Sequence, residues 1–327
     1  MFGSRGVKFL AAVIFVILAS LPATGRTEEF NLKVGHVLAP THPYQLGLEK
    51  FCKLVDEKTG GAVKVQAFHS SQLGNEREMI EGLQLGTLDM TLVSTAPLAG
   101  FSNQFLVFDL PYIFKTRKTA HATVDGPVGT AILETLDSKG IVGLAYWENG
   151  FRHVSNSKQP LLKPEDMKGM KIRTMENKIH MASFKTILAD PTPMAFGELF
   201  TALQQKVVDA QENPLPVFFT SNFFEVQKYI SLTGHFYAAS PFLVSKAVWQ
   251  GLPAKYQEAI RQAANEARDY ERNMIEQMDN DLVKELKAKG VEVSEVDKNV
   301  WAAAMEPVYV EYEKTIGKET IEKVREK

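Results

Sequence analysis

The sequence lacks several features that would define a specialised class of protein. Cys52 is the single cysteine among 327 residues, so no internal disulfide bond can form. Charges nearly balance at a formal net charge of −2, whereas binding nucleic acid requires a concentrated basic surface. The signature motifs of hydrolases, zinc peptidases, phosphate-binding loops and dinucleotide-binding folds are absent. These absences exclude a disulfide scaffold and argue against a nucleic-acid binder. They also mean that no known catalytic motif supports an enzyme.

Long hydrophobic runs are also missing, apart from a short one at the N-terminus. Arg5 and Lys8 precede an apolar stretch over 9–21, and small residues follow up to Gly25. This order is typical of a secretory signal peptide, and about 13 apolar residues fall short of the ~20 that span a membrane. We therefore expect a signal peptide over 1–25, cleaved near Gly25, and a diffusible periplasmic protein without a membrane anchor.

The remaining composition is that of a globular protein with a substantial core, at 45% hydrophobic and 23% charged residues. A single core rarely exceeds ~250–300 residues, so the length predicts two lobes with a cleft between them. Cys52 lies in an apolar helical pattern with Leu48, Phe51 and Val55, which favours a buried structural thiol over a reactive one.

Strand and helix patterns alternate along the chain. In the first part, strands are expected at 32–36, 63–68 and 90–93, and helices at 43–57 and from Asn75, where a capping box begins. This order predicts a parallel sheet with right-handed crossovers. In a second block, strands are expected at 141–147, 152–155, 170–174, 229–233 and 241–244, and helices at 164–168, 178–188 and 196–206.

The lobes can be assigned from these patterns and from one long helix over 254–289, whose apolar positions recur every three to four residues. The first lobe is expected to comprise 26–145 and part of 230–327. The second is expected to comprise 146–229 and part of 230–260. The fold class is therefore α/β, with two mixed sheets flanked by helices and a long helix that braces both lobes.

Candidate chemistry is sparse, and the arginines that follow strands are its most informative members. His36 and His42 share a loop but have no cysteine or paired histidine to complete a metal site, so we expect no bound metal. Arg152 and Arg173 each stand where a strand ends, and a guanidinium group matches a carboxylate with two parallel hydrogen bonds. Surface ion pairs are the structural alternative for both arginines.

At these arginines the sequence resembles the DctP-type solute-binding receptors of tripartite ATP-independent periplasmic (TRAP) transporters. The resemblance covers nearly the whole chain after the signal peptide. Six motifs in order carry it, namely Ser71-Gln72-Leu73-Gly74, Gly86-Thr87-Leu88-Asp89, Leu110-Pro111-Tyr112, Asp166-Met167-Lys168-Gly169-Met170-Lys171-Ile172-Arg173, Pro191-Thr192-Pro193-Met194-Ala195-Phe196 and Val208-Asp209-Ala210-Gln211-Glu212-Asn213-Pro214.

The resemblance implies a two-lobed periplasmic binding protein fold (type II-like) that closes on its ligand by hinge motion, without a cofactor. Arg173 matches the family's arginine that forms a salt bridge with the substrate carboxylate. Arg152 matches a second arginine of the cleft, and Asn213 matches an asparagine that bonds the same carboxylate. Phe196 matches an aromatic wall of the site.

Four further residues are candidate ligand contacts, in decreasing order Trp147, Tyr44, His36 and Glu76. Glu76 falls where the family's sialic-acid receptors carry an aspartate near the ligand. The same residue also fits a helix-start acid that the helix dipole stabilises, and the two interpretations are equally supported.

Departures from the family pattern bear on the ligand. Ser94 and Pro97 stand where the sialic-acid receptors have a glutamate and an arginine, which disfavours sialic acid. A C4-dicarboxylate, a 2-oxo or 2-hydroxy acid, a branched dihydroxy acid or a uronate fits better, and the sequence does not rank them. Glu176 and Asn177 could contact ligand hydroxyl groups or cap the next helix.

Three functions remain in competition. The leading one is a monomeric receptor for a small carboxylate that delivers it to the small and large membrane subunits of a TRAP transporter. A sensor that docks to a membrane-bound kinase is the second. An exported enzyme is the third, and it would need a base in the cleft, for which His36, Glu148 and Glu212 are the candidates.

Overall fold

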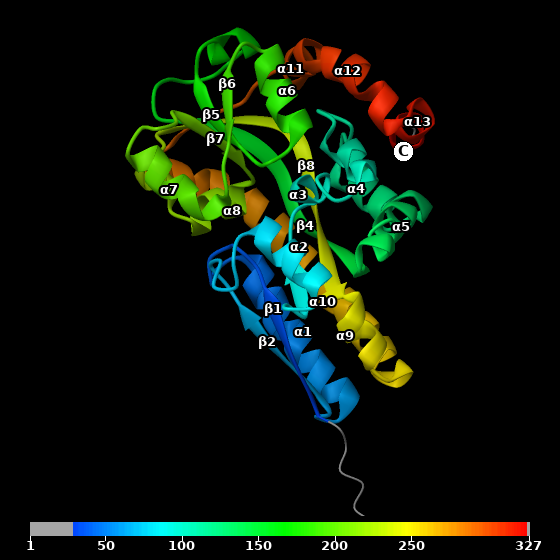
Figure 1. Cartoon of the computed structure of the whole chain (residues 1–327). Coiled ribbons are helices and arrows are strands. Elements are labelled where there is room, and N and C mark those ends of the chain that lie inside the picture. Colours follow the sequence, from blue (N-terminus) through cyan, green and yellow to red (C-terminus); the bar gives the residue numbers. More distant parts are fainter. Residues whose placement is uncertain (1–28, 326–327) are drawn as a thin grey trace, which may run out of the picture.

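The computed structural model describes residues 29–325, which fold into two lobes (Figure 1). The expected signal peptide over 1–25 lies outside these residues. The strands are β1 (Phe30–Gly35), β2 (Val63–Phe68), β3 (Met90–Leu92), β4 (Ile141–Asn156), β5 (Lys171–Thr174), β6 (Asp190–Pro193), β7 (Ala210–Asn213), β8 (Tyr229–Ser245) and β9 (Glu292–Ser294). The α-helices are α1 (Pro43–Thr59), α2 (Glu76–Leu85), α3 (Thr95–Leu98), α4 (Arg117–Val124), α5 (Pro127–Glu134), α6 (Lys178–Thr186), α7 (Phe196–Gln204), α8 (Leu215–Thr220), α9 (Lys246–Gly251), α10 (Ala254–Ala288), α11 (Lys298–Met305), α12 (Pro307–Ile316) and α13 (Lys318–Arg325). Short 3₁₀ helices are η1 (Asn103–Asp109), η2 (Asp137–Lys139), η3 (Pro164–Met167) and η4 (Phe223–Glu225).

One mixed sheet of nine strands runs through the described residues of both lobes. Its order is β2-β1-β3-β8-β4-β7-β5-β6, with β9 paired to β8. In the first lobe β1 is parallel to β2 and β3, and in the second β5 is parallel to β6 and β7, as crossover helices require. Because β8 is antiparallel to both β3 and β4, the two mixed sheets expected from the sequence are joined into one.

The long strands β4 and β8 connect the lobes, with 16 and 17 residues respectively. Their pairing shifts register at three points, one of them between Glu148 and Gly150, and such β-bulges bend a strand. Gly150 has a φ of +111°, a conformation that side chains rarely adopt. The bulge at 148–150 is therefore a bend at the junction of the lobes, and we call it the hinge bulge.

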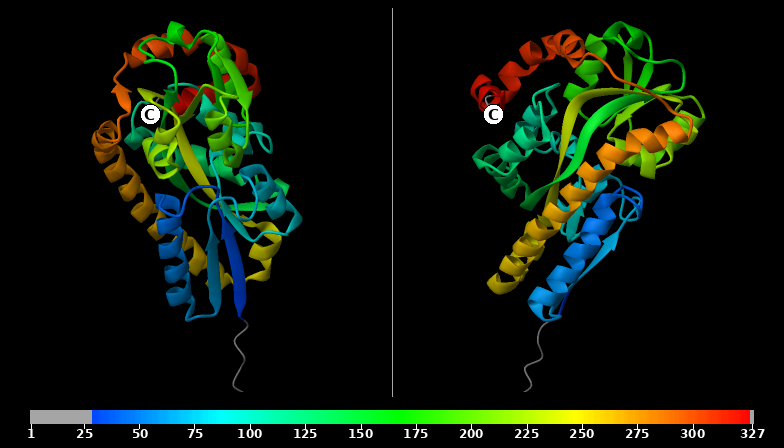
Figure 2. Two further views of the ribbon diagram at one scale, coloured as in Figure 1. Left: turned by 90° about the vertical axis from the view of Figure 1, so that its left-hand side faces the viewer. Right: turned by 180° about the vertical axis from the view of Figure 1, so that it is seen from behind.

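Helix α10 lies against both lobes (Figure 2). Its 35 residues span about 52 Å at 1.5 Å per residue. It packs on α1 and β4 in the first lobe and on α8 in the second, burying residues such as Ile260, Ala264 and Leu282. The helix thus occupies the stretch for which the sequence predicted a bracing helix.

The remaining helices cover the sheet and the ends of the cleft. The C-terminal helices α11 and α12 pack on α6, and α12 and α13 pack on η1. Cys52 is half-buried in α1 against the core, and burial raises the pKa of its thiol to about 12. Across residues 29–325, none of the helices combines the length and the apolar character that crossing a bilayer demands.

Candidate functional site

Two buried arginines of the second lobe face the first lobe. Arg152 in β4 is 1% exposed and Arg173 in β5 is 2% exposed. Strand β7 lies between β4 and β5 and ends at Asn213, which pairs with His153 of β4. Asn213 Oδ1 accepts a hydrogen bond from Arg152 Nη2 at 3.0 Å. The sheet order therefore gathers the three polar residues that the family resemblance assigned to the ligand carboxylate.

Arg152 is held by an internal ion pair. Its Nη2 atom donates to Glu212 Oε1 at 2.8 Å, and Nε donates to Oε2 of the same carboxylate. Burial would raise the pKa of Glu212, but Arg152 and His235, whose Nε2 lies 3.4 Å from Glu212 Oε2, lower it well below its ordinary value. Glu212 is thus ionised at neutral pH and neutralises Arg152 within the fold.

Arg173 has no such counter-charge in contact. Its Nε and Nη2 atoms donate to the Met194 carbonyl oxygen at 2.9 and 2.7 Å, and no carboxylate of the described chain forms a salt bridge with it. Its Nη1 atom is buried without a hydrogen-bond partner among the described residues. Burial lowers the pKa of Arg173 to about 10, so the side chain remains charged at neutral pH. A buried cation without a contacting counter-charge is the most distinctive feature of the cleft.

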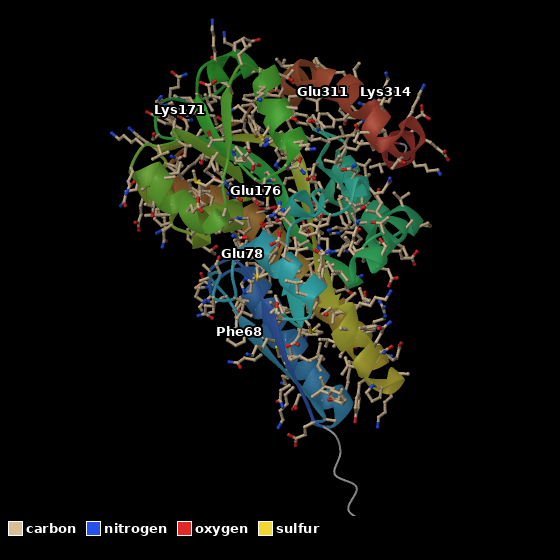
Figure 3. The ribbon with its side chains drawn as sticks, viewed as in Figure 1. Phe68, Glu78, Lys171, Glu176, Glu311 and Lys314 are labelled. Atoms are coloured by element: carbon tan, nitrogen blue, oxygen red, sulfur yellow. The ribbon has the colours of Figure 1, made fainter. Side chains whose placement is uncertain are left out.

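A cavity of about 10 Å³ lies beside Arg173 between the lobes. This volume is at the lower limit of what one water molecule needs, so the two lobes are closed on each other in this structure. Glu78 of α2 and Glu176 after β5 mark the two sides of the junction (Figure 3). The cavity is lined by Asn75, Glu76, Arg77, Pro97, Arg173, Met175, Glu176, Met194, Ala195 and Phe196.

Glu76 reaches this cavity from the start of α2. The Asn75–Glu78 capping box places it in the first helical turn, where the helix dipole favours an acid. Its Oε1 atom accepts a hydrogen bond from the Ser94 backbone NH at 2.7 Å. Partial burial raises the pKa of Glu76, while the Ser94 NH and Arg173 oppose the rise. The helix-start and cleft interpretations of Glu76 are therefore compatible.

Comparison with known proteins agrees with this geometry. The profile of the family "Bacterial extracellular solute-binding protein, family 7" (DctP) matches residues 34–315. The chain belongs to this family. A solute-binding protein of Verminephrobacter eiseniae is 43% identical over 86% of this chain and 84% of its own. The 2,3-diketo-L-gulonate-binding periplasmic protein YiaO of Escherichia coli is 36% identical over 91% and 92% of the two chains.

A solved structure shares the fold of this family 7 protein. It is a TRAP periplasmic solute-binding protein from Polaromonas sp. JS666, bound to D-erythronate. It is 42% identical, with a TM-score of 0.89 over 91% of this chain and 98% of the other. The two-lobed α/β fold predicted from the sequence is confirmed, and the relatives are named as binding proteins rather than enzymes.

The other candidate contacts occupy different places in this family 7 protein. Phe196 begins α7 at the cavity wall and meets Phe223 edge to face, with ring centroids 5.9 Å apart. Tyr44 is buried against Ser240 of β8, to which its hydroxyl group is hydrogen-bonded. Trp147 packs among α1, α10 and Phe242, and its indole NH donates to the Ala264 carbonyl at 3.1 Å. This placement directs the Trp147 side chain to the bracing helix.

The candidate bases of the enzyme hypothesis are all engaged in internal bonds. His36 accepts from the Leu38 NH and donates to Gln45 Oε1, and burial lowers its pKa to about 4. Glu148 accepts from Arg117 Nε at 2.7 Å and from His121 Nε2 at 2.8 Å. Glu212 is bound to Arg152. Among residues 29–325, no group of three or more His, Cys, Asp or Glu side chains is arranged to hold a metal ion.

The sequence allowed Asn177 to be either a ligand contact or a helix cap, and in the structure its side chain caps α6. Its Oδ1 accepts from the Ile179 and His180 backbone NH groups. Its Nδ2 donates to the Ala96 carbonyl of the first lobe at 3.0 Å, so the residue also links the closed lobes.

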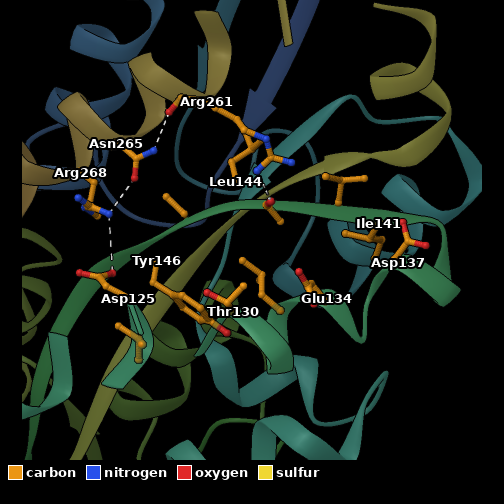
Figure 4. A pocket seen from close by; sticks show the side chains of 15 residues that line it. Asp125, Thr130, Glu134, Asp137, Ile141, Leu144, Tyr146, Arg261, Asn265 and Arg268 are labelled. Carbon is orange, nitrogen blue, oxygen red and sulfur yellow. Dashed lines mark hydrogen bonds and ion pairs between the residues drawn. The ribbon is translucent and has the colours of Figure 1, made fainter. Parts of the chain in front are cut away.

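A second, larger hollow lies between α5, β4 and α10, with a volume of about 640 Å³ (Figure 4). Its two arginines are paired with lining residues or with backbone, and its carboxylates Glu134 and Asp137 are exposed. Arg268 lies 3.7 Å from Asp125 and donates to Asn265 Oδ1, while Arg261 donates to the Gly143 carbonyl. Among its described lining residues, this hollow has no buried charge without a counter-charge comparable to Arg173 in the interlobe cleft.

Proposed function

We propose that this protein is the periplasmic receptor of a TRAP transporter, which binds a small organic acid between its lobes and delivers it to the membrane subunits. The observation that carries the proposal is Arg173, a buried cation with no counter-charge in contact among the described residues. A ligand carboxylate supplies the missing negative charge and can bond Nη1.

Arg152, Asn213 and Phe196 complete the proposed site. Arg152 Nη1 is also buried without a partner among the described residues, and it provides a second donor. Hydrogen bonds to charged groups contribute ~1.5–3 kcal/mol each, and micromolar affinity requires about 8 kcal/mol. Two arginines and the asparagine can supply much of this, and Phe196 adds an apolar wall. Tyr44 and His36 have an indirect role in this proposal, because they fix the position of the first-lobe residues that line the site.

The transport role is supported by the relatives. The protein of known structure is named as a TRAP periplasmic component, and YiaO is named as periplasmic. In this proposal the receptor acts as a monomer and delivers the acid to the small and large membrane subunits. Because the cavity is about 10 Å³ in the closed lobes, entry of the acid requires opening, for which the hinge bulge provides the bend.

The test is a thermal-shift screen of the chain from residue 26 against small organic acids that include D-erythronate, followed by calorimetric titration. An acid at 100 times its dissociation constant adds ~2.7 kcal/mol to the free energy of unfolding. Arg173→Ala should abolish the effect. Lys171→Ala removes the same charge from an exposed position of β5 and should retain it. The proposal fails if no acid stabilises the protein, or if Arg173→Ala binds as tightly as the wild type.

A further inference from the structure

The two walls of the cleft have opposite hydrogen-bonding character. On the second lobe, Arg173 lines the cavity and has a buried Nη1 donor without a partner among the described residues. Arg152 has a similar buried Nη1 atom but does not itself line the cavity. On the first lobe, the Glu76 carboxylate lines the same cavity as Arg173. A carboxylate has about four acceptor positions, and the Ser94 NH occupies one of them. The Arg173 donor and the remaining acceptor positions of Glu76 therefore belong to one cavity.

Asn149 of the hinge bulge adds a buried acceptor next to Ser94, although it does not itself line the cavity. Its Nδ2 atom donates to Ser94 Oγ at 3.3 Å, next to the Ser94 NH that bonds Glu76. Its Oδ1 atom is buried and lacks a hydrogen-bond partner within the described part of the chain.

A ligand between these walls must satisfy both of them. Its carboxylate meets the arginines, and its other polar groups meet Glu76. A hydroxyl group can donate a hydrogen bond to Glu76, whereas a second carboxylate would place two negative charges together in a partly dehydrated site. Resting on the proposed function, we infer that Glu76 selects hydroxylated monocarboxylic acids and rejects dicarboxylic acids of the same length. C4-dicarboxylates are thereby removed from the acids that the sequence leaves open.

A matched set of four-carbon acids tests this inference. D-Erythronate and meso-tartrate differ only in the terminal group, which is a CH₂OH in the first and a carboxylate in the second, and butanoate lacks hydroxyl groups. Calorimetric titration should show the wild type binding D-erythronate at least about tenfold more tightly than either of the others, since one hydrogen bond to a charged group has that effect. Should a different acid emerge from the screen, the same comparison uses that acid and its counterpart with a terminal carboxylate.

Glu76→Gln keeps the size of the side chain and removes its charge. The variant should bind D-erythronate roughly tenfold more weakly and meso-tartrate more tightly, so the ratio of the two affinities collapses. Glu198→Gln is the control, because it removes the same charge from an exposed position that does not line the cavity and should preserve the ratio. A thermal melt of each variant verifies that it is folded.

The outcomes separate the two proposals. A wild type that binds meso-tartrate as tightly as D-erythronate overturns the selectivity inference, whether or not Glu76→Gln folds, and leaves the receptor function intact. An affinity ratio that survives in Glu76→Gln overturns the role of Glu76. Failure of every acid to bind, with Arg173→Ala behaving like the wild type, sinks the receptor function itself.

Discussion

Glu212→Gln should strongly destabilise the protein, because it removes the counter-charge of Arg152. Both side chains are almost completely buried, at 1% and 0% exposure. Breaking a buried ion pair by removing one partner costs about 3–5 kcal/mol, since the other charge is left unpaired. Arg152 Nη2 keeps its bonds to the Glu212 backbone carbonyl and to Asn213 Oδ1. We therefore expect a loss near the lower end, about 3 kcal/mol in the free energy of unfolding.

Urea unfolding without ligand measures this loss, with Glu198→Gln as the control for an exposed glutamate of the same lobe. Replacing both partners, as in Arg152→Met with Glu212→Leu, should recover most of the stability, because an apolar pair does not have to be desolvated. A loss below about 1 kcal/mol in Glu212→Gln would refute the reasoning. So would a double variant no more stable than the single one, because an unpaired Arg152 could not then be the cause.

Two further predictions concern the hinge bulge and its surroundings. Burial raises the pKa of Asp279 to about 6, although Arg117 opposes the rise. Folded Asp279 therefore holds a proton that the unfolded state has already released. The stability that this proton contributes is lost as the pH increases from about 4 through 6. Asp279→Asn should therefore gain up to about 3 kcal/mol relative to the wild type between pH 4 and pH 7 in urea titrations, and a pH-independent difference would contradict this. Gly150→Ala should cost about 1–3 kcal/mol, because φ is +111° although the added methyl group would meet only ordinary contacts. Gly251→Ala, in open space at the end of α9, should leave the stability unchanged or raise it by up to about 1 kcal/mol, because alanine is the better helix former. Equal losses at the two glycines would exclude backbone strain as the reason.

The local elements could be predicted wherever neighbouring residues determine them. The capping box at Asn75 and the strand β2 were found from short patterns because their signals lie within a few residues. The long strands β4 and β8 were each divided in two, since Gly150 and Gly234 interrupt the apolar pattern as they would at a turn. Pairing along both strands continues past these interruptions, and this long-range hydrogen bonding is not visible in a local pattern.

The candidate site shows the same limit. The resemblance assigned Arg152, Arg173 and Asn213 to one cluster, and the sheet order brings them to neighbouring strands. It could not reveal the partner of Arg152, because Glu212 is 60 residues away. Trp147 was expected near the ligand, but the direction of a strand side chain beside a bulge depends on how many residues the bulge inserts. The contact of Trp147 with α10 follows from that register.

The two arginines that look equivalent in the sequence differ in their partners, and we therefore propose different roles for them. Glu212 neutralises Arg152, so this arginine links the paired strands β4 and β7 before any ligand is bound. Arg173 is bonded only to the neutral carbonyl of Met194 among the described residues, so its charge is the one that a ligand must compensate. Desolvating Arg173 in the absence of an acid costs free energy, and a bound carboxylate removes that cost in the closed state. In the proposed function, closure and binding of an acid are therefore coupled through Arg173, and the closed state is favoured when the ligand is present.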